Sequence, residues 1–392
     1  MRNTIMLLLL LVFAMKATAQ SNIDNVLAAI KTNNKSIIAE VQYWEAEKLQ
    51  YKTGLNPDNP VVEYDYLKGS PANAGNQTDL TISQSFDFPT VYTKRNQLAK
   101  GKIAQAEHKL NAARQDILLE AKMTCIELVY LNKIRNQLIE RKSVLEVLLR
   151  GFQLKLEKGE GNILDVNKAK LQLIEIKKEY QENASLINQR NLKLTELNGG
   201  NLISLLDTVY PVLPLIPPFE QLESEYESND PLRKDLEQEK SNARKQIEVS
   251  KALAFPKLEL GFHYQGIIGQ NYNGVHTGLT LPLWENKNIV RQRKAAELFA
   301  DYTLQAHVNE HYFHIKHIYE KYSNLKIILN EYETSLPDLR DYKLLNKALT
   351  AGQFSAIEYF MEASFFFTAI DNYLETEKEY YLTVAELYKY QL

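Results

Sequence analysis

The sequence predicts a mainly α-helical chain with a small β part, built from long antiparallel helical hairpins and four β-strands. Three observations lead to this fold class. One pattern of prolines, glycines and acids occurs twice, long stretches without helix breakers carry a helical periodicity, and four short runs alternate apolar and polar residues. Each copy of the pattern is therefore expected to hold one strand pair and one long helix with shorter helices beside it.

The duplication is read from the distances between equivalent residues. Three pairs of equivalent residues are 193 apart: Pro89 and Pro282, Gly159 and Gly352, Asp165 and Glu358. The prolines that open the strand pairs, Pro60 and Pro256, are 196 apart. This period is too long for a solenoid repeat and predicts two half-domains packed side by side. We expect a signal peptide at 1–19, a first repeat at 20–197, an inter-repeat segment at 198–228 and a second repeat at 229–392.

The first residues have the features of a secretory signal peptide. Arg2 supplies the positive charge, 5–14 form a short apolar core, and Ala17-Thr18-Ala19 is a small-residue cleavage site. The alternative, a membrane anchor, needs about 20 apolar residues and is disfavoured. No cysteine follows the cleavage site, so nothing indicates a lipid anchor at the N-terminus.

Composition excludes several classes of function. Without residues 1–19 the chain has 44 basic and 49 acidic side chains, since Arg2 and Lys16 are removed, and this balance argues against a nucleic-acid-binding surface. Cys125 is the only cysteine and cannot form an internal disulfide. We find no nucleophile elbow, phosphate loop or zinc-protease helix. The sequence therefore predicts neither an enzyme nor a cofactor.

The longest helix is expected between residues 92 and 158, where no proline occurs. A stripe that repeats every seven residues is typical of a coiled-coil-like seam. Its members are Leu110, Ile117, Thr124, Leu131, Leu138, Leu145 and Phe152. About 65 helical residues measure roughly 100 Å, about twice the width of a compact domain of this mass. Shorter helices are expected beside it at 24–53 and 164–197. In the second copy we expect a long helix at 286–351, interrupted by Pro337, with shorter helices at 230–254 and 355–392.

Four runs have the period of two that is typical of β-strands. Val62, Tyr64 and Tyr66 alternate with acids; the others lie near 80–88, 258–265 and 278–283, and loops are expected at 69–76 and 266–274. A half-buried sheet of a soluble domain and a membrane-spanning strand both give this pattern. Four strands cannot close a membrane barrel, and open sheet edges do not occur in lipid. If the strands span a membrane, several copies must share one barrel.

At this point the chain resembles the TolC-like outer-membrane efflux proteins, over essentially all of its length after the signal peptide. The resemblance is carried by the two turns with an acid six residues after Gly159 and Gly352, by the prolines around the strand pairs, and by the helix start Asn229-Asp230-Pro231-Leu232. At the equivalent helix start the first copy has Asn33-Asn34-Lys35-Ser36, which lacks the proline. The resemblance implies a homotrimer with one shared 12-stranded β-barrel in outer-membrane lipid and a long periplasmic α-barrel. It also implies a periplasmic adaptor (membrane fusion protein) and an inner-membrane pump, of the RND type.

The glycine turns are the first candidate site. Gly159, Gly161 and Gly352 allow a tight reversal between antiparallel helices, and Asp165 and Glu358 fall in the first turn of the next helix. One interpretation is that the two acids only cap these helices. The other, implied by the resemblance, is that the turns are the periplasmic tips where the adaptor docks.

Four histidines close together form the second candidate site. His307, His311, His314 and His317 fall within eleven residues, and a spacing of four lets imidazoles share a metal ion such as zinc, copper or nickel. The plainer interpretation is a partly solvated helix face. The metal interpretation fits the heavy-metal (cation) efflux branch of the family.

These observations together predict a passive exit duct for small molecules or metal ions, driven by a separate pump through an adaptor. We expect it in the outer membrane with a long periplasmic extension. The alternative is an exported, elongated helical scaffold or adhesion protein without a pore.

Overall fold

The computed structural model of the protein describes residues 22–339 and 342–392. The predicted signal peptide, 1–19, lies outside these residues. The described residues form two compact units. Unit 1 comprises 22–39, 113–226 and, apart from 340 and 341, 313–392; unit 2 comprises 40–112 and 227–312. No helix within the described residues is long and apolar enough to cross a membrane.

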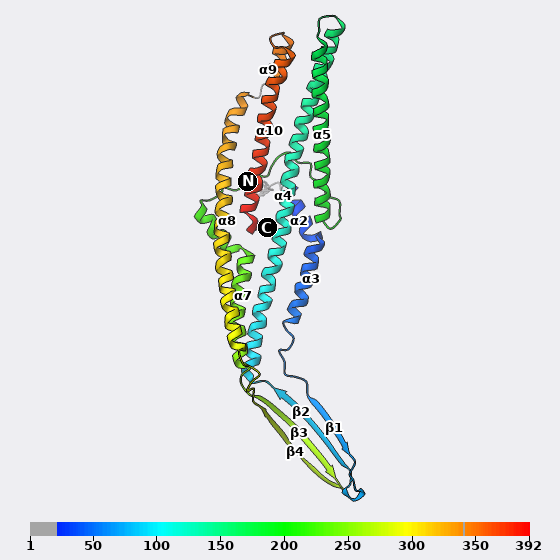
Figure 1. Ribbon diagram of the computed structural model, residues 1–392, viewed down its shortest axis with the longest axis vertical. Coiled ribbons are helices and arrows are strands. Elements are labelled where there is room, and N and C mark those ends of the chain that lie inside the picture. Colours follow the sequence, from blue (N-terminus) through cyan, green and yellow to red (C-terminus); the bar gives the residue numbers. More distant parts are fainter. Residues whose placement is uncertain (1–21, 340–341) are drawn as a thin grey trace, which may run out of the picture. The chain divides into compact units, whose positions relative to one another are not determined.

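Helices make up most of the chain (Figure 1). The α-helices are α2 (Asn22–Asn33), α3 (Lys35–Gln50), α4 (Pro89–Glu157), α5 (Ile163–Leu197), α6 (Phe219–Asn229), α7 (Pro231–Ala252), α8 (Ile289–Leu339), α9 (Tyr342–Thr350) and α10 (Ala356–Leu387). The predicted long helix at 92–158 is confirmed as α4. Two helices, α8 and α9, are described within the predicted helix at 286–351, with residues 340 and 341 between them outside the described residues, and Pro337 lies inside the last turn of α8.

The prediction of one helix over 24–53 is wrong, because Asn34 separates α2 from α3. The side-chain oxygen of Asn34 accepts a hydrogen bond from the N–H of Ile37 at 2.9 Å and caps α3. Asp230, 196 residues later, caps α7 by accepting from Leu232 and Arg233, both at 3.1 Å. Helices α2 and α6 thus occupy equivalent places, and α6 covers 219–228 of the segment 198–228 that was expected to join the repeats.

The core of unit 1 is built on the seven-residue seam of α4. Thr124, Leu131, Leu138 and Leu145 are buried there. The buried amide of Asn132 donates to the carbonyls of residues 205 and 207, both at 3.1 Å, and so fixes the inter-repeat segment to α4. The sequence-derived stripe therefore marks the face that packs inside the unit.

The sheet of unit 2 has four antiparallel strands in the order β1-β2-β3-β4, as Figure 1 shows. They are β1 (Val61–Leu67), β2 (Gln77–Phe86), β3 (Lys257–Ile267) and β4 (Gln270–Thr280). The loop predicted at 266–274 is wrong: only Ile268 and Gly269 join β3 to β4, with φ of 46° and 75°. Positive φ at both positions is the geometry of a two-residue hairpin turn of type I′. Strand β4 ends before Leu281 and Leu283, next to Pro282, which lacks the N–H for a ladder bond.

The two faces of this sheet differ sharply in polarity. One row across all four strands joins Val62, Ile82, Phe262 and Val275, all of which are exposed in the single chain. The neighbouring row on the opposite face is polar over its first three strands, with Glu63, Thr81 and His263, and Thr81 Oγ1 lies 2.8 Å from His263 Nδ1. The predicted alternation of apolar and polar faces is confirmed. The outer edges of β1 and β4 have no partner strand among the described residues.

Candidate functional site: the helix tips and an arginine pocket in unit 1

The first predicted turn is built by backbone geometry that requires glycine. Gly159 follows α4 with φ of 78°. Its N–H donates to the Leu156 carbonyl at 3.0 Å, and the N–H of Glu160 donates to the Lys155 carbonyl at 2.9 Å. These two bonds are a Schellman motif, which satisfies the last carbonyls of the helix. A Cβ at Gly161 would lie 2.6 Å from the backbone nitrogen of Leu156, so this position also excludes a side chain.

The second turn repeats the first one. Gly352 has φ of 74°, and its N–H donates to the Leu349 carbonyl at 3.1 Å. The N–H of Gln353 donates to the Ala348 carbonyl at 2.9 Å, which completes the same motif. The 193-residue offset found in the sequence therefore reflects a repeated helix ending.

The two acids sit where a carboxylate stabilises the next helix. Glu358 forms a capping box with Ser355: its Oε2 accepts from the Ser355 N–H at 2.8 Å, and the Ser355 hydroxyl oxygen accepts from the Glu358 N–H at 3.2 Å. The hydrogen bonds with Ser355 hold the pKa of Glu358 below its ordinary value. Asp165 lies in the first turn of α5, which is capped by the Asn162 side chain accepting from the Leu164 N–H at 2.9 Å. Glu358 is thus a capping residue, and docking by either acid stays a prediction.

The structure brings the two tips together. Although they are 193 residues apart, both line one hollow of about 470 Å³ within unit 1. Its wall contains Gly159, Gly161 and Asp165 from the first tip and Gly352 and Ser355 from the second. This open hollow is shaped by both repeats, so a partner bound in it would contact both.

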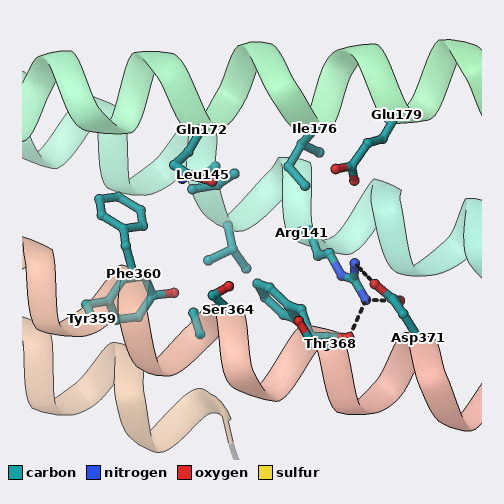
Figure 2. Close-up of a pocket in the computed structure, with 13 residues that line it drawn as sticks. Arg141, Leu145, Gln172, Ile176, Glu179, Tyr359, Phe360, Ser364, Thr368 and Asp371 are labelled. Atoms are coloured by element: carbon teal, nitrogen blue, oxygen red, sulfur yellow. Dashed lines mark hydrogen bonds and ion pairs between the residues drawn. The ribbon is translucent and has the colours of Figure 1, made fainter.

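A second pocket of unit 1, of about 200 Å³, lies among α4, α5 and α10 (Figure 2). Arg141 of α4 points into it, with only 6% of its side chain exposed. Its guanidinium donates two hydrogen bonds, of 2.5 and 2.9 Å, to the carboxylate of Asp371 on α10. Its guanidinium also lies over the Phe367 ring, 4.5 Å from the centroid. Glu179 of α5 directs its carboxylate toward this pair in Figure 2. Partial burial raises the pKa of Glu179, and the charge of Arg141 partly offsets the effect.

Sequence reasoning missed this pocket. Arg141 and Asp371 are 230 residues apart and look like ordinary solvated charges on helices. One signal was present: Arg141 lies three residues after Leu138 and four before Leu145, beside the buried seam. A cation at that position must be paired, because an unpaired buried charge is costly.

The four histidines separate into different surroundings. In unit 2, His307 Nε2 lies 3.3 Å from Asp230 Oδ2, and the rings of His307 and His311 are 5.6 Å apart. In unit 1, His314 is exposed and its Nε2 lies 3.5 Å from Glu386, while His317 is also exposed. Within the part of the chain that the structure describes, no three His, Cys, Asp or Glu side chains are arranged to hold a metal ion. Metal binding by these histidines stays a prediction.

No model of a protein family matches the chain, and no curated protein matches it. Solved structures do. CusC, studied in crystals for its folding and transmembrane channel formation, superposes with a TM-score of 0.78 at 12% identity, covering 95% of this chain and 92% of CusC. A membrane protein from Pseudomonas aeruginosa superposes with a TM-score of 0.79 at 14% identity, covering 95% of this chain and 94% of that protein. The CmeC outer membrane channel of Campylobacter jejuni superposes with a TM-score of 0.73 at 17% identity, covering 94% of this chain and 85% of CmeC.

These likenesses extend over nearly the whole chain and establish its fold. The protein has the fold of the TolC-like outer-membrane channels, with long helices and one four-stranded antiparallel sheet per chain. The resemblance drawn from the sequence is confirmed at the level of the fold.

Proposed function

We propose that the protein is the outer-membrane channel of a tripartite efflux system, a passive exit duct driven by an inner-membrane pump. The observation that carries this proposal is the sheet of unit 2. It has one apolar and one polar face, and its two edges are unpaired in the described chain. A sheet of this kind is stable in lipid only when its edges are closed by further strands.

A homotrimer supplies that closure. Three copies of four strands give a shared 12-stranded barrel, with the apolar row of Val62, Ile82, Phe262 and Val275 toward lipid and the polar row toward water. The fold shared with outer membrane channels such as CmeC supports this assembly.

The test is fractionation followed by gel mobility of the detergent extract with and without heating. We expect an outer-membrane protein that migrates near the mass of three chains and collapses to one on boiling, and that conducts ions in planar bilayers. A soluble periplasmic monomer would instead indicate the exported scaffold and would refute the channel.

We further propose that a periplasmic adaptor docks at the two tips. Nothing lies within 4 Å of a Cβ added at Gly159 or Gly352, so tryptophan there alters the surface of the hollow, although the positive φ of both positions strains any side chain. Gly200 is a matched control, since it also has positive φ, 92°, and open space, and it lies outside the hollow. We expect Gly159→Trp and Gly352→Trp to abolish export while trimers remain in the membrane, and Gly200→Trp to preserve export. Export by both tip variants would refute docking.

Metal ions are one proposed substrate class, alongside small organic molecules. If the histidines guide metal ions, alanine at His307, His311, His314 and His317 raises the metal sensitivity of cells that depend on this channel. Unchanged tolerance at normal expression would remove the metal proposal and leave the channel proposal intact.

A further inference from the structure

We propose that the helix ends next to the sheet of unit 2 form a basic collar that binds the headgroups of anionic phospholipids at the membrane surface. The inference rests on the proposed function, since a collar needs a membrane to bind. The collar consists of the segments 87–102, 244–257 and 281–294. They contain twelve basic and three acidic side chains, whereas the whole sequence has 46 basic and 49 acidic ones. The basic residues are Lys94, Arg95, Lys100, Lys102, Arg244, Lys245, Lys251, Lys257, Lys287, Arg291, Arg293 and Lys294.

Contacts within unit 2 hold the three segments together. The rings of Phe88 and Phe255 stack with centroids 4.9 Å apart, which joins the first segment to the second. The side-chain amide of Asn286 donates to the Leu253 carbonyl at 2.9 Å, which joins the third segment to the second. The charges are therefore concentrated in one region, at the end of the sheet where β2 and β4 lead into helices α4 and α8 (Figure 1).

Helix stability does not explain these charges. The N-terminus of a helix favours acids and disfavours nearby cations, because the peptide dipoles place positive charge there. Helices α2, α5, α6 and α10 follow this rule with an acid in the first turn, whereas α3, α7 and α9 have none, so the cations rather than the missing acids distinguish α8. Helices α4 and α8 have no acid in the first turn, and α8 places Arg291, Arg293 and Lys294 within its first six residues. An anion outside the protein accounts for cations at an unfavourable position.

The acids of the collar leave most of its positive charge unbalanced. Asp87 is 2.8 Å from Arg95, and Glu248 is 2.7 Å from Lys251. Glu297, three residues beyond the collar, is 2.8 Å from Arg244, so three of the twelve basic side chains are paired in these contacts. Lys287, Arg291 and Lys294 are exposed in the single chain. Each basic side chain near an anionic membrane surface contributes about 1 kcal/mol to attraction, so a collar with many of them discriminates strongly between anionic and neutral lipids.

Apolar side chains beside the charges indicate a lipid rather than a free anion. Trp284 is 80% exposed, and Leu281, Leu283 and Phe255 are exposed as well. Trp284 lies four residues after the end of β4, and tryptophan is enriched where membrane meets water. Charge and apolar surface together match a phospholipid, which presents a phosphate and acyl chains at one place.

One groove of unit 2 has both basic and apolar side chains in its lining. It lies between α7 and α8, and its lining contains four basic residues, Arg244, Lys245, Lys251 and Lys294. Two acids of the same lining pair with two of them, Glu297 with Arg244 and Glu248 with Lys251, so Lys245 and Lys294 carry its excess positive charge. The buried Ile247 and the exposed Leu298 form its apolar wall. The groove has room for about 600 Å³, which accommodates a headgroup and the first part of an acyl chain.

The experiment compares charge-reversal variants of the full chain, purified in detergent and stripped of lipid. The collar variant is Lys287→Glu with Arg291→Glu and Lys294→Glu. The control carries the same charge change at three exposed lysines of unit 1: Lys31→Glu, Lys177→Glu and Lys316→Glu. Phosphatidylglycerol and phosphatidylcholine are titrated separately, and bound lipid is counted by native mass spectrometry. Fractionation and heat-dependent gel mobility of each variant test the channel proposal independently.

We expect the wild type and the control to prefer phosphatidylglycerol. The collar variant should lose more than about 100-fold in affinity for it, since removing each of three basic residues costs about fivefold and the new carboxylates repel the lipid phosphate. A triple Lys287→Gln, Arg291→Gln, Lys294→Gln variant, less prone to misfolding, is expected to lose affinity to a smaller extent. Equal binding of both lipids by the wild type would overturn the inference, as would equal losses in collar and control variants. Displacement of the lipid by the same concentration of inorganic phosphate would overturn the lipid as occupant. If the wild type forms heat-sensitive trimers but shows no preference for phosphatidylglycerol, the collar is refuted while the channel proposal stands.

Discussion

Removing Asp371 tests the pocket among α4, α5 and α10 most directly. In Asp371→Ala the guanidinium of Arg141, 6% exposed, loses both of its carboxylate bonds, and its Nε already has no hydrogen-bond partner. Breaking a buried ion pair by removing one partner costs about 3–5 kcal/mol, because the remaining charge is left uncompensated. The Asp371 side chain is 41% exposed, and water reaches the vacated position, so we expect the lower end, about 3 kcal/mol.

The reverse truncation should cost less. In Arg141→Ala the remaining Asp371 carboxylate is solvated, and the loss is mainly the contact with the Phe367 ring and the packed side-chain stem, together about 1–2 kcal/mol. Placing Arg141→Met in the Asp371→Ala background removes the stranded charge while filling similar space. We therefore expect the double variant to regain most of the stability lost by Asp371→Ala.

Amide hydrogen exchange in the assembled protein measures these differences locally, without assuming that a membrane protein unfolds in one step. A cost of about 3 kcal/mol accelerates exchange about 150-fold in the turns around residues 141 and 371. The reasoning is refuted if Arg141→Ala accelerates exchange as much as Asp371→Ala, or if the double variant exchanges no more slowly than Asp371→Ala alone.

Three further predictions concern the tips and the sheet. Gly161→Ala should accelerate exchange at the first tip, because its Cβ would meet the backbone 2.6 Å away, whereas Gly151→Ala, with open space inside α4, should stabilise the helix by up to about 1 kcal/mol. Glu358→Ala should loosen the first turn of α10 at pH 7, measured as faster amide exchange than in the wild type. Since the pKa of Glu358 lies below its ordinary 4.5, the difference between variant and wild type should persist above pH 4.5 and vanish as the pH falls through the lowered pKa. A difference in exchange that is independent of pH would contradict the capping role. Ile82→Lys, on the apolar face of the sheet, should lower the stability of the barrel in lipid by about 2–4 kcal/mol, while Thr81→Lys, opposite Glu63 on the polar face, should be tolerated. Equal yields of heat-sensitive trimer from both variants would contradict the assignment of faces.

Much of the fold followed from the sequence because local periodicity reports which face of an element is buried. The seam that includes Leu131 and Leu138 is buried in α4, and the strands alternate as their residues predict. Both tip glycines have the positive φ that their place after a long helix requires. Each of these features depends on residues close together in the chain, so spacing alone is sufficient.

Features that depend on distant partners could not be predicted. Asn34 breaks the first helix partly because its amide reaches the Leu197 carbonyl, 163 residues away, at 2.7 Å. Ile268 adopts φ of 46° because the register of β3 and β4 leaves only two residues for the turn, against the residue's own preference.

The sequence by itself predicted two repeats and determined the types and approximate lengths of most elements and the glycine turns as sites worth examining. Only the tertiary structure decided that both tips share one hollow, that Arg141 meets Asp371, and that three basic segments adjoin the same end of the sheet. The physical reason is that periodicity encodes the orientation of a side chain relative to its own helix or strand. Which other element lies opposite that side chain is set by packing between residues that the sequence places hundreds of positions apart.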